Sequence, residues 1–225
     1  MIRAIVPHMG LRERKKAQTR HHIAQVAWRL FADHGFDQVT VAHVAREAEV
    51  AVATVFNYFP TKEALFFSPL ETFEAHLLEA VATRPAGEPV LAAFRRFLLA
   101  AGGLLAQADA GDAQALERLR TLNRVIAASS TLQAREHHAL AATADALAAQ
   151  LAAETNARPH DPHPQVAANA LLGVQRALVA YTRQRVLADP APTGLAADVQ
   201  RYAEAAFALL VHGLGDYAPG RRPAR

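Results

Sequence analysis

The chain has 225 residues, a net charge of +3 at neutral pH, and a composition that is 52% hydrophobic and 20% charged. This apolar content can support a packed core, which excludes a chain that is disordered throughout, and no apolar run reaches the roughly 18 residues of a transmembrane helix. The chain has no cysteine, which excludes disulfides, thiolate zinc sites and a thiol nucleophile.

The beginning of the chain concentrates positive charge. Residues 1–22 hold six Lys or Arg side chains against Glu13 alone, whereas residues 69–225 hold equal numbers of acidic and basic side chains. Such a basic cluster either binds a polyphosphate partner through counterion release or is a solvated tail. The first ten residues lack the apolar core of a signal peptide, so we expect a cytoplasmic protein.

Three short amphipathic helices are predicted after this basic segment. Apolar residues recur at helical spacing over residues 23–31, 41–48 and 52–59. Thr40 is predicted to be the N-cap of the second helix, and Pro60 ends the third. The third apolar stripe consists of Val52, Val55, Phe56 and Phe59. The tight connection between the second and third helices predicts a helix-turn-helix.

Long helical patterns fill the rest of the chain. Ser68, Pro69 and Glu71 have the spacing of a capping box, which predicts a break near residue 68 in the helix that Thr61 caps. Further helices are expected over residues 88–107, 112–128, 131–155, 164–188 and 195–215. The predicted organisation is therefore all-α: a tail 1–11, a helix-turn-helix domain 12–60, a helical domain 61–216 and a tail 217–225.

The block from Thr40 to Leu65, TVAHVAREAEVAVATVFNYFPTKEAL, resembles the DNA-binding signature of the TetR family of one-component transcriptional regulators. The matching residues are Thr40, Val41, Val44, Ala45, Ala48, Val50, Thr54, Val55, Phe56, Tyr58, Phe59, Pro60, Thr61, Lys62, Glu63 and Leu65. With the segment before it, the resemblance covers about residues 12–66. It implies a three-helix N-terminal DNA-binding domain and a C-terminal helical bundle for ligand binding and dimerisation.

Two residues depart from the family pattern. Glu49 stands where the family has a turn glycine, and a side chain there is expected to shift the turn out of the left-handed region. Ala51 replaces the Ser or Thr that caps the third helix, which leaves a backbone N–H without a side-chain acceptor. Both changes fall in the part of the chain that the resemblance assigns to DNA binding, and the sequence leaves open whether they weaken it.

The DNA-contacting residues are predicted partly from the geometry of a helix-turn-helix, whose second helix enters the major groove, and partly from the resemblance, which implies that Phe56, Asn57, Tyr58 and Lys62 reach the DNA. The predicted set is Val52, Ala53, Thr54, Phe56, Asn57, Tyr58, Lys62, Ala42, His43, Lys15, Lys16 and Arg20. Val52 and Ala53 offer only apolar contacts, for example to a thymine methyl, and Asn57 offers a hydrogen bond. The resemblance implies that Lys62 clamps a phosphate, and the basic residues near the N-terminus are expected to contact phosphate or the minor groove.

Several of these assignments have an alternative. Phe56 either belongs to the core through the apolar stripe or presents its edge to DNA. Tyr58 either donates to a phosphate or packs on the surface. Ala42 and His43 either neighbour the phosphates or belong to an exposed helix start.

Candidate residues for an effector pocket interrupt the apolar stripes of the helical domain with polar groups. They are Asn123, Thr143, Gln175 and Tyr181, and each is either a ligand contact or a satisfied polar group of the core. His160 and His163 could hold a metal ion, but their proline-rich loop favours solvated turn residues. No catalytic residue, metal site or cofactor is predicted.

The predicted function is that of a sequence-specific DNA-binding regulator, most simply a repressor that a small molecule releases from its operator. Its expected partners are double-stranded operator DNA, a small-molecule effector and a second copy of the chain, and no membrane. Dimerisation is expected through the helices 164–188 and 195–215, whose apolar faces are wide. The alternatives are a helical protein-binding adaptor and an enzyme that uses the helical domain; salt-dependent binding to duplex DNA would distinguish them from a regulator.

Overall fold

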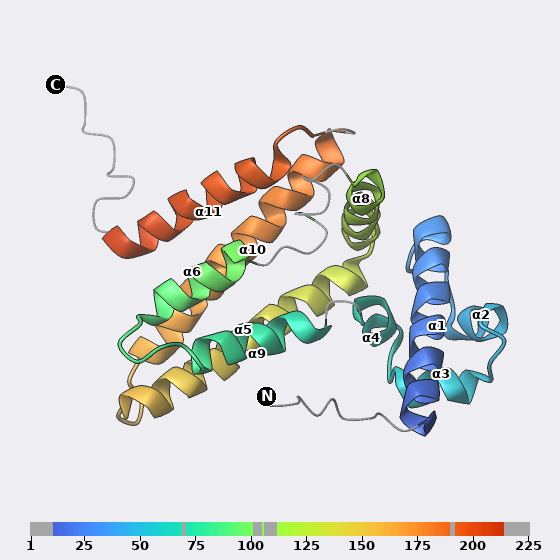
Figure 1. Cartoon of the computed structure of the whole chain (residues 1–225), viewed down its shortest axis with the longest axis horizontal. Coiled ribbons are helices and arrows are strands. Elements are labelled where there is room, and N and C mark those ends of the chain that lie inside the picture. The colour runs from blue at the N-terminus through green and yellow to red at the C-terminus, as the bar shows by residue number, and fades with distance from the viewer. Residues whose placement is uncertain (1–10, 69–70, 101–104, 106–111, 190–191, 214–225) are drawn as a thin grey trace, which may run out of the picture. The chain divides into compact units, whose positions relative to one another are not determined.

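The computed structural model describes residues 11–68, 71–100, 105, 112–189 and 192–213, and the regular elements among them are all α-helices (Figure 1). The helices are α1 (Leu11–His34), α2 (Val41–Glu47), α3 (Val52–Tyr58), α4 (Lys62–Phe67), α5 (Glu71–Ala82), α6 (Val90–Ala100), α8 (Ala113–Ala127), α9 (Ser130–Thr155), α10 (His163–Ala188) and α11 (Leu195–His212). The all-α prediction is confirmed. Within the described ranges, no helix has both the length and the apolar character needed to cross a bilayer.

The chain divides into two compact units. The first unit contains α1 to α4 together with the corner between α8 and α9, residues 125–132, and the second contains the remaining helices. Because α4 packs against α1, it belongs with the first three helices. This division differs from the predicted domain boundary after residue 60, which assigned α4 to the helical domain.

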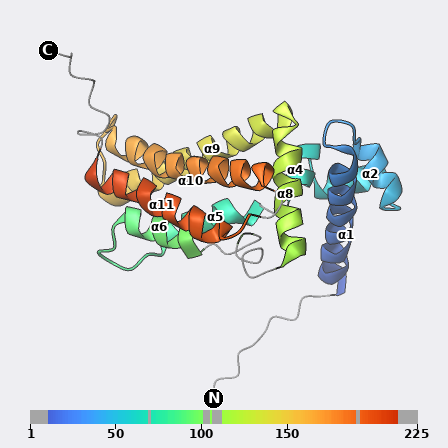
Figure 2. The ribbon, with the colours of Figure 1, turned by 90° about the horizontal axis from the view of Figure 1, so that it is seen from above.

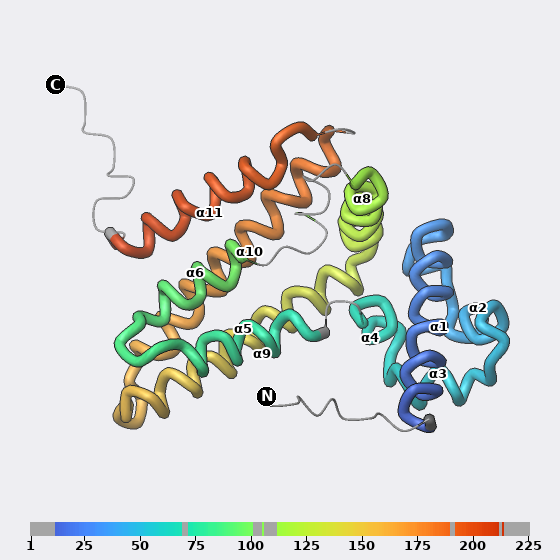
Figure 3. Tube along the Cα trace, in the orientation of Figure 1, coloured from blue at the N-terminus to red at the C-terminus, as the bar shows by residue number. Residues whose placement is uncertain are grey.

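Aromatic side chains fill the core of the first unit. The Phe66 ring, from α4, lies 5.7 Å from Phe31 and 5.8 Å from Phe36, measured between ring centroids. Trp28 lies 5.8 Å from the same ring. α1 packs against both α2 and α4, and α2 packs against α3. α1 is therefore the helix that connects the others of the first unit, whose trace is labelled in Figure 3.

Side-chain caps define where the short helices of the first unit begin. The hydroxyl of Thr40 accepts a 3.1 Å hydrogen bond from the backbone N–H of His43, and that of Thr61 accepts a 3.0 Å bond from Ala64. Each bond satisfies one of the N–H groups that a helix start leaves unpaired. The predicted role of both threonines is confirmed.

The second unit is built around the antiparallel pair α10 and α11, which pack against each other and against α6 (Figure 2). Its core contains Leu77, Phe94, Leu147, Leu171 and Phe207, all at most 3% exposed. Phe94 and Phe207 meet edge to face, with 6.4 Å between ring centroids. The core therefore joins side chains from α5, α6, α9, α10 and α11.

The break near residue 68 exists, but Ser68 does not begin the next helix as predicted. Ser68 has the helical backbone conformation (φ −53°, ψ −31°) and its hydroxyl donates a 3.0 Å hydrogen bond to the carbonyl of Leu65. An N-cap residue would instead have an extended backbone, so Ser68 closes α4. Pro69, much of the predicted helix end at 101–107 and both predicted tails, apart from Leu11, lie outside the described residues.

Candidate nucleic-acid interface

The first turns of α1 carry a cluster of exposed positive charges. Arg12, Arg14, Lys15 and Lys16 are exposed, and they lie within the helix, which begins at Leu11. Arg20, further along α1, is half-buried, and its guanidinium lies 4.7 Å from the centre of the Phe59 ring. Residues 11–22 of the predicted basic segment therefore lie on a helix, and Arg20 connects this helix to the residue that follows α3.

The connection from α2 to α3 keeps the left-handed turn that a glycine would favour. Glu49 has φ +54°, its N–H donates to the carbonyl of Arg46 (3.1 Å), and the N–H of Val50 donates to the carbonyl of Ala45 (2.9 Å). This pair of bonds is the Schellman motif that ends helices at a left-handed residue. The expectation that Glu49 shifts the turn is wrong: the two hydrogen bonds hold it, and Glu49 bears the strain.

The N-terminus of α3 has no side-chain cap, as the sequence predicts. Ala51 occupies the N-cap position with an extended backbone (φ −68°, ψ 148°) and makes no side-chain hydrogen bond. Its carbonyl still accepts from Thr54 at 2.9 Å, so the helix begins there. A missing cap costs about 1 kcal/mol, and this cost weakens the helix that faces DNA in a helix-turn-helix.

The apolar stripe predicted for α3 divides into two ridges. Val55 and Phe59 are each 1% exposed and form the buried ridge, whereas Val52 is 41% exposed and Phe56 is 48% exposed. The interpretation of Phe56 as a core residue is wrong, because its side chain is exposed; its contact with DNA, like that of Val52, stays a prediction. Both pairs have i, i+4 spacing, so periodicity alone could not distinguish the buried ridge from the exposed one.

The remaining predicted contacts of α3 differ in exposure. Ala53 and Asn57 are exposed, while Thr54 and Tyr58 are half-buried. The Tyr58 ring lies 6.5 Å from that of Phe59, which places it beside the buried ridge. Asn57 is therefore the exposed side chain of α3 that can form hydrogen bonds with a base edge.

Lys62 has partners inside the first unit. Its ammonium donates to the carbonyls of Phe36 (3.0 Å) and Val39 (3.1 Å) and lies 4.1 Å from the centre of the Phe36 ring. Lys62 thereby satisfies two backbone carbonyls in the turn between α1 and α2 and connects this turn to the beginning of α4. These two bonds use two of the three N–H groups of the ammonium. The phosphate contact that the resemblance implies would therefore have only the third N–H, unless these bonds break.

The start of α2 places Ala42 and His43 differently. Ala42 is exposed, whereas His43 is half-buried, with its ring 6.0 Å from that of His34 and its Nε2 3.9 Å from the Glu47 carboxylate. His43 thus has contacts of its own within the first unit. Ala42 can offer only its methyl and backbone.

In the second unit, Asn123 belongs to a polar network that the sequence did not indicate. Its amide donates to the carbonyl of Leu119 (2.8 Å), and its carbonyl oxygen accepts from the guanidinium of Arg183 (3.1 Å). Arg183 also pairs with Glu136 at 2.7 Å, and both of these side chains are 19% exposed. The network joins α8, α9 and α10, and it satisfies Asn123 without a ligand.

The other three predicted pocket residues do not join this network. Thr143 is buried and its hydroxyl donates to the carbonyl of Ala139 (2.9 Å). Tyr181 stacks on Tyr202 with 4.4 Å between ring centroids, and Arg185 donates to its hydroxyl. Gln175 is 7% exposed, and its side-chain oxygen has no hydrogen-bond partner.

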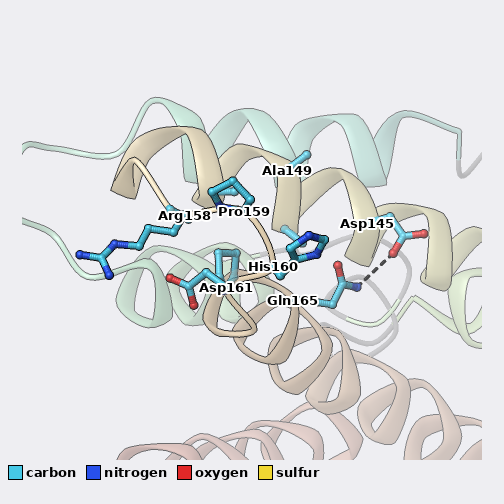
Figure 4. A pocket seen from close by; sticks show the side chains of 11 residues that line it. Asp145, Ala149, Arg158, Pro159, His160, Asp161 and Gln165 are labelled. Atoms are coloured by element: carbon cyan, nitrogen blue, oxygen red, sulfur yellow. Dashed lines mark hydrogen bonds between the residues drawn. The ribbon is translucent and has the colours of Figure 1, made fainter.

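An open groove of about 460 Å³ lies beside the loop between α9 and α10 (Figure 4). Its polar lining includes Asp145, Arg158, His160, Asp161 and Gln165, and Gln165 donates to Asp145 at 3.0 Å. None of the four predicted pocket residues lines this groove.

The histidine-rich loop beside this groove does not assemble a metal site. Nδ1 of His163 lies 2.5 Å from the carboxylate of Asp161, and hydrogen bonds from the backbone and ring of His163 lower the pKa of Asp161. In the ranges that the structure describes, no three His, Cys, Asp or Glu side chains are close enough to hold a metal ion.

Two family models match this chain, one for each part. Residues 23–68 match the model described as bacterial regulatory proteins, tetR family, and residues 88–215 match the MftR C-terminal domain. The chain is 32% identical over 186 residues to MftR of Mycobacterium tuberculosis, a protein named as a transcriptional regulator of mycofactocin biosynthesis; the match covers 78% of this chain and 84% of that one. It is also 37% identical over 84 residues to the HTH-type transcriptional regulator TcmR of Streptomyces glaucescens, which covers 37% of each chain.

Solved structures share this fold at low sequence identity. NalD of Pseudomonas aeruginosa, described as the secondary repressor of the MexAB-OprM multidrug efflux pump, has a TM-score of 0.57 at 22% identity over 86% of this chain and 96% of that one. SmeT, solved in complex with triclosan, has a TM-score of 0.55 at 16% identity over 90% of this chain and 99% of that one. These likenesses establish the arrangement of helices in both parts of the chain.

Proposed function

The chain belongs to the TetR family of bacterial regulatory proteins and is a DNA-binding transcriptional regulator, and we propose that it is a homodimeric repressor that a small molecule releases from its operator. The observation that carries this proposal is the division of chemistry within the first unit. Exposed cations gather on α1, while the exposed residues of α3 carry no charge. Phosphate contacts position a protein on DNA, and base contacts select a sequence. The charged surface of α1 suits the first task, and the uncharged surface of α3 suits the second.

The placement of the cations supports a role outside folding. The N-terminal end of a helix carries a partial positive charge, so Lys and Arg there are unfavourable by a few tenths of a kcal/mol or more each. Arg12, Arg14, Lys15 and Lys16 all lie in the first two turns of α1, with Glu13 as the acidic residue among them. Duplex DNA is a negatively charged partner that such a cluster of cations suits.

A small-molecule effector is supported by the buried polar groups of the second unit. The side-chain oxygen of Gln175, a buried residue of α10, has no hydrogen-bond partner, and a buried unpaired acceptor costs about 1 to 3 kcal/mol. A mainly apolar ligand with one N–H or O–H donor would remove this cost. The solved complex of SmeT with triclosan, a phenol, is an example of such a ligand on this fold.

A homodimer is supported by apolar side chains that the single chain leaves exposed on α10 and α11. They are Val166, Leu187, Tyr202 and Val211, with exposed fractions between 38% and 64%. Two copies of this helix pair can bury these side chains in a four-helix interface around a two-fold axis. Two-fold symmetry places two copies of α3 against two half-sites, about 34 Å or one DNA turn apart.

The proposal is tested by sequencing the genomic DNA fragments that the full-length protein retains, and by placing the most enriched fragment before a reporter gene. We expect an inverted repeat with half-sites about one turn apart, and reporter expression that falls when the protein is present. Light scattering should give a mass twice the 24.3 kDa of the chain. Retention of fragments without a common sequence, or a reporter that the protein activates, would contradict the repressor assignment.

A further inference from the structure

The exposed face of α3 is almost entirely apolar. Four of its seven residues are exposed, namely Val52, Ala53, Phe56 and Asn57, and three of these are apolar. Val52 and Phe56, one helical turn apart, form an exposed ridge with about half of the Phe56 surface in contact with solvent. Exposed apolar side chains that lie together mark a surface that a partner covers.

The composition of α3 limits which bases it can recognise. Guanine is contacted chiefly by Arg or Lys, and cytosine by Asp or Glu, through groups at the edge of the major groove. The segment 50–60, which contains α3, has none of these four residue types. The remaining groups of the major groove are the thymine 5-methyl, which suits apolar side chains, and the adenine edge, which suits Asn.

We propose that the ridge of Val52 and Phe56 contacts thymine 5-methyl groups, and that these contacts select the operator of this protein. The inference rests on the DNA-binding function and adds the base chemistry that the operator must have. The occupant of the ridge is duplex DNA because the same unit presents the exposed cations of α1, which complement phosphate.

The dimensions of the ridge match neighbouring base pairs. Side chains at i and i+4 lie about 5 to 6 Å apart at their Cβ atoms, and successive base pairs rise about 3.4 Å. The ridge therefore spans one to two base-pair steps and can cover two methyl groups. Asn57 follows Phe56 directly on the exposed surface and can bond the adenine of an A·T pair, so the whole face favours A·T pairs.

The experiment removes the methyl groups from the DNA and the ridge from the protein in turn. The full-length protein first selects a duplex from a random library, and this duplex is then synthesised with uracil in place of one thymine at a time. Uracil lacks only the methyl and keeps base pairing. We expect binding to fall about three- to fourfold for each methyl that the ridge covers, and about tenfold or more when two are removed together.

The variants Val52→Ala and Phe56→Ala connect that loss to the ridge. Both side chains are exposed, so the variants should melt within about 1 °C or 2 °C of the parent protein. Each should bind the thymine duplex more weakly, and each should lose its response to uracil at the thymine that the removed side chain covers. As a matched control, Lys16→Ala should weaken binding to both duplexes equally, because Lys16 is exposed on α1 and its charge suits phosphate.

The outcomes separate this inference from the DNA-binding function. Equal binding of thymine and uracil duplexes by the parent protein, or a selected sequence without thymine, would overturn the methyl contacts and leave the DNA-binding function intact. A uracil effect that persists unchanged in both ridge variants would assign the methyl contact to another part of the protein. Failure to bind any duplex would instead contradict the proposed function.

Discussion

The hydroxyl of Ser129, at the corner between α8 and α9, donates a 2.8 Å hydrogen bond to the carboxylate of Asp37, which follows α1. Ser129 is 1% exposed, and the same hydroxyl accepts a 3.4 Å bond from the backbone N–H of Leu132. One side chain thus caps α9 and fixes residues 125–132 to the first unit. The corner is the part of the later sequence that packs with the DNA-binding helices.

Replacing Ser129 should loosen this corner. Ser129→Ala leaves the Leu132 N–H without its cap and Asp37 without its donor, which should lower the free energy of unfolding by about 1 to 2 kcal/mol. Thermal unfolding and hydrogen exchange at the Leu132 amide measure the effect. Asp37→Asn is the matched control, because its carbonyl oxygen still accepts the bond and stability should fall by less. A larger loss in Asp37→Asn than in Ser129→Ala would show that the charge of Asp37, and not the bond, holds the corner.

Lys62 should matter to stability more than to DNA affinity. Lys62→Met removes two charge-assisted bonds to the carbonyls of Phe36 and Val39 and should cost about 2 kcal/mol. Lys16→Met, at an exposed site, should leave the melting temperature unchanged and weaken DNA binding with a flatter salt dependence. If Lys62→Met melted like the parent protein and lost affinity as Lys16→Met does, the phosphate role implied by the resemblance would be correct.

The strained turn before α3 should be relieved by glycine. Glu49→Gly removes the cost of a side chain at φ +54° but adds the cost of the greater entropy of glycine in the unfolded chain. We expect the free energy of unfolding to rise by about 0.5 to 1 kcal/mol. Glu49→Gln keeps the strain and removes the charge, so it should leave the melting temperature unchanged. In binding titrations at low salt, both variants should bind DNA more tightly, because a negative charge near phosphate is lost. If the glycine variant melted at a lower temperature than the glutamine variant, the claim that the backbone of Glu49 is strained would be wrong.

The ion pair between α9 and the segment that follows α5 should make stability depend on pH. Arg84 pairs with Glu154 through two bonds of 2.6 and 3.2 Å, and these bonds hold the pKa of Glu154 below its ordinary value. A carboxyl with a lowered folded pKa stabilises the protein above its unfolded pKa, and the contribution is lost as pH falls through the folded pKa.

Glu154→Gln should therefore melt about 2 °C below the parent protein at pH 7, and the difference should shrink as the pH falls below the ordinary pKa of a glutamate and vanish below the lowered pKa of folded Glu154. Melting curves across this pH range measure it. A difference that stayed constant with pH would mean that the charge of Glu154 does not contribute.

Local sequence patterns predicted the helices and their starts, because capping and apolar period depend on neighbours in the chain. Thr40, Thr61 and the uncapped Ala51 all lie where the sequence places them. The period of α3 could not show which of its two ridges is buried, since that depends on the packing of α3 against the rest of the first unit, including α2.

The side-chain partners were less predictable because they lie far apart in the sequence. Lys62 bonds carbonyls 23 and 26 residues before it, and Arg183 bonds Asn123 across 60 residues. Spacing along one helix carries no information on such pairs. Glu49 is a different case: the neighbouring hydrogen bonds impose the left-handed turn, although the residue itself disfavours it.

The central claim is sequence-specific DNA binding, and a fluorescence anisotropy titration tests it most directly. The full-length protein is titrated against a labelled duplex selected from its genome and against a scrambled duplex of the same composition, over a range of salt concentrations. The account predicts that the selected duplex binds at least about a thousandfold more tightly at physiological salt, and that the logarithm of both affinities falls linearly with the logarithm of the salt concentration. Equal affinity for the two duplexes, or affinity that salt does not change, would contradict it.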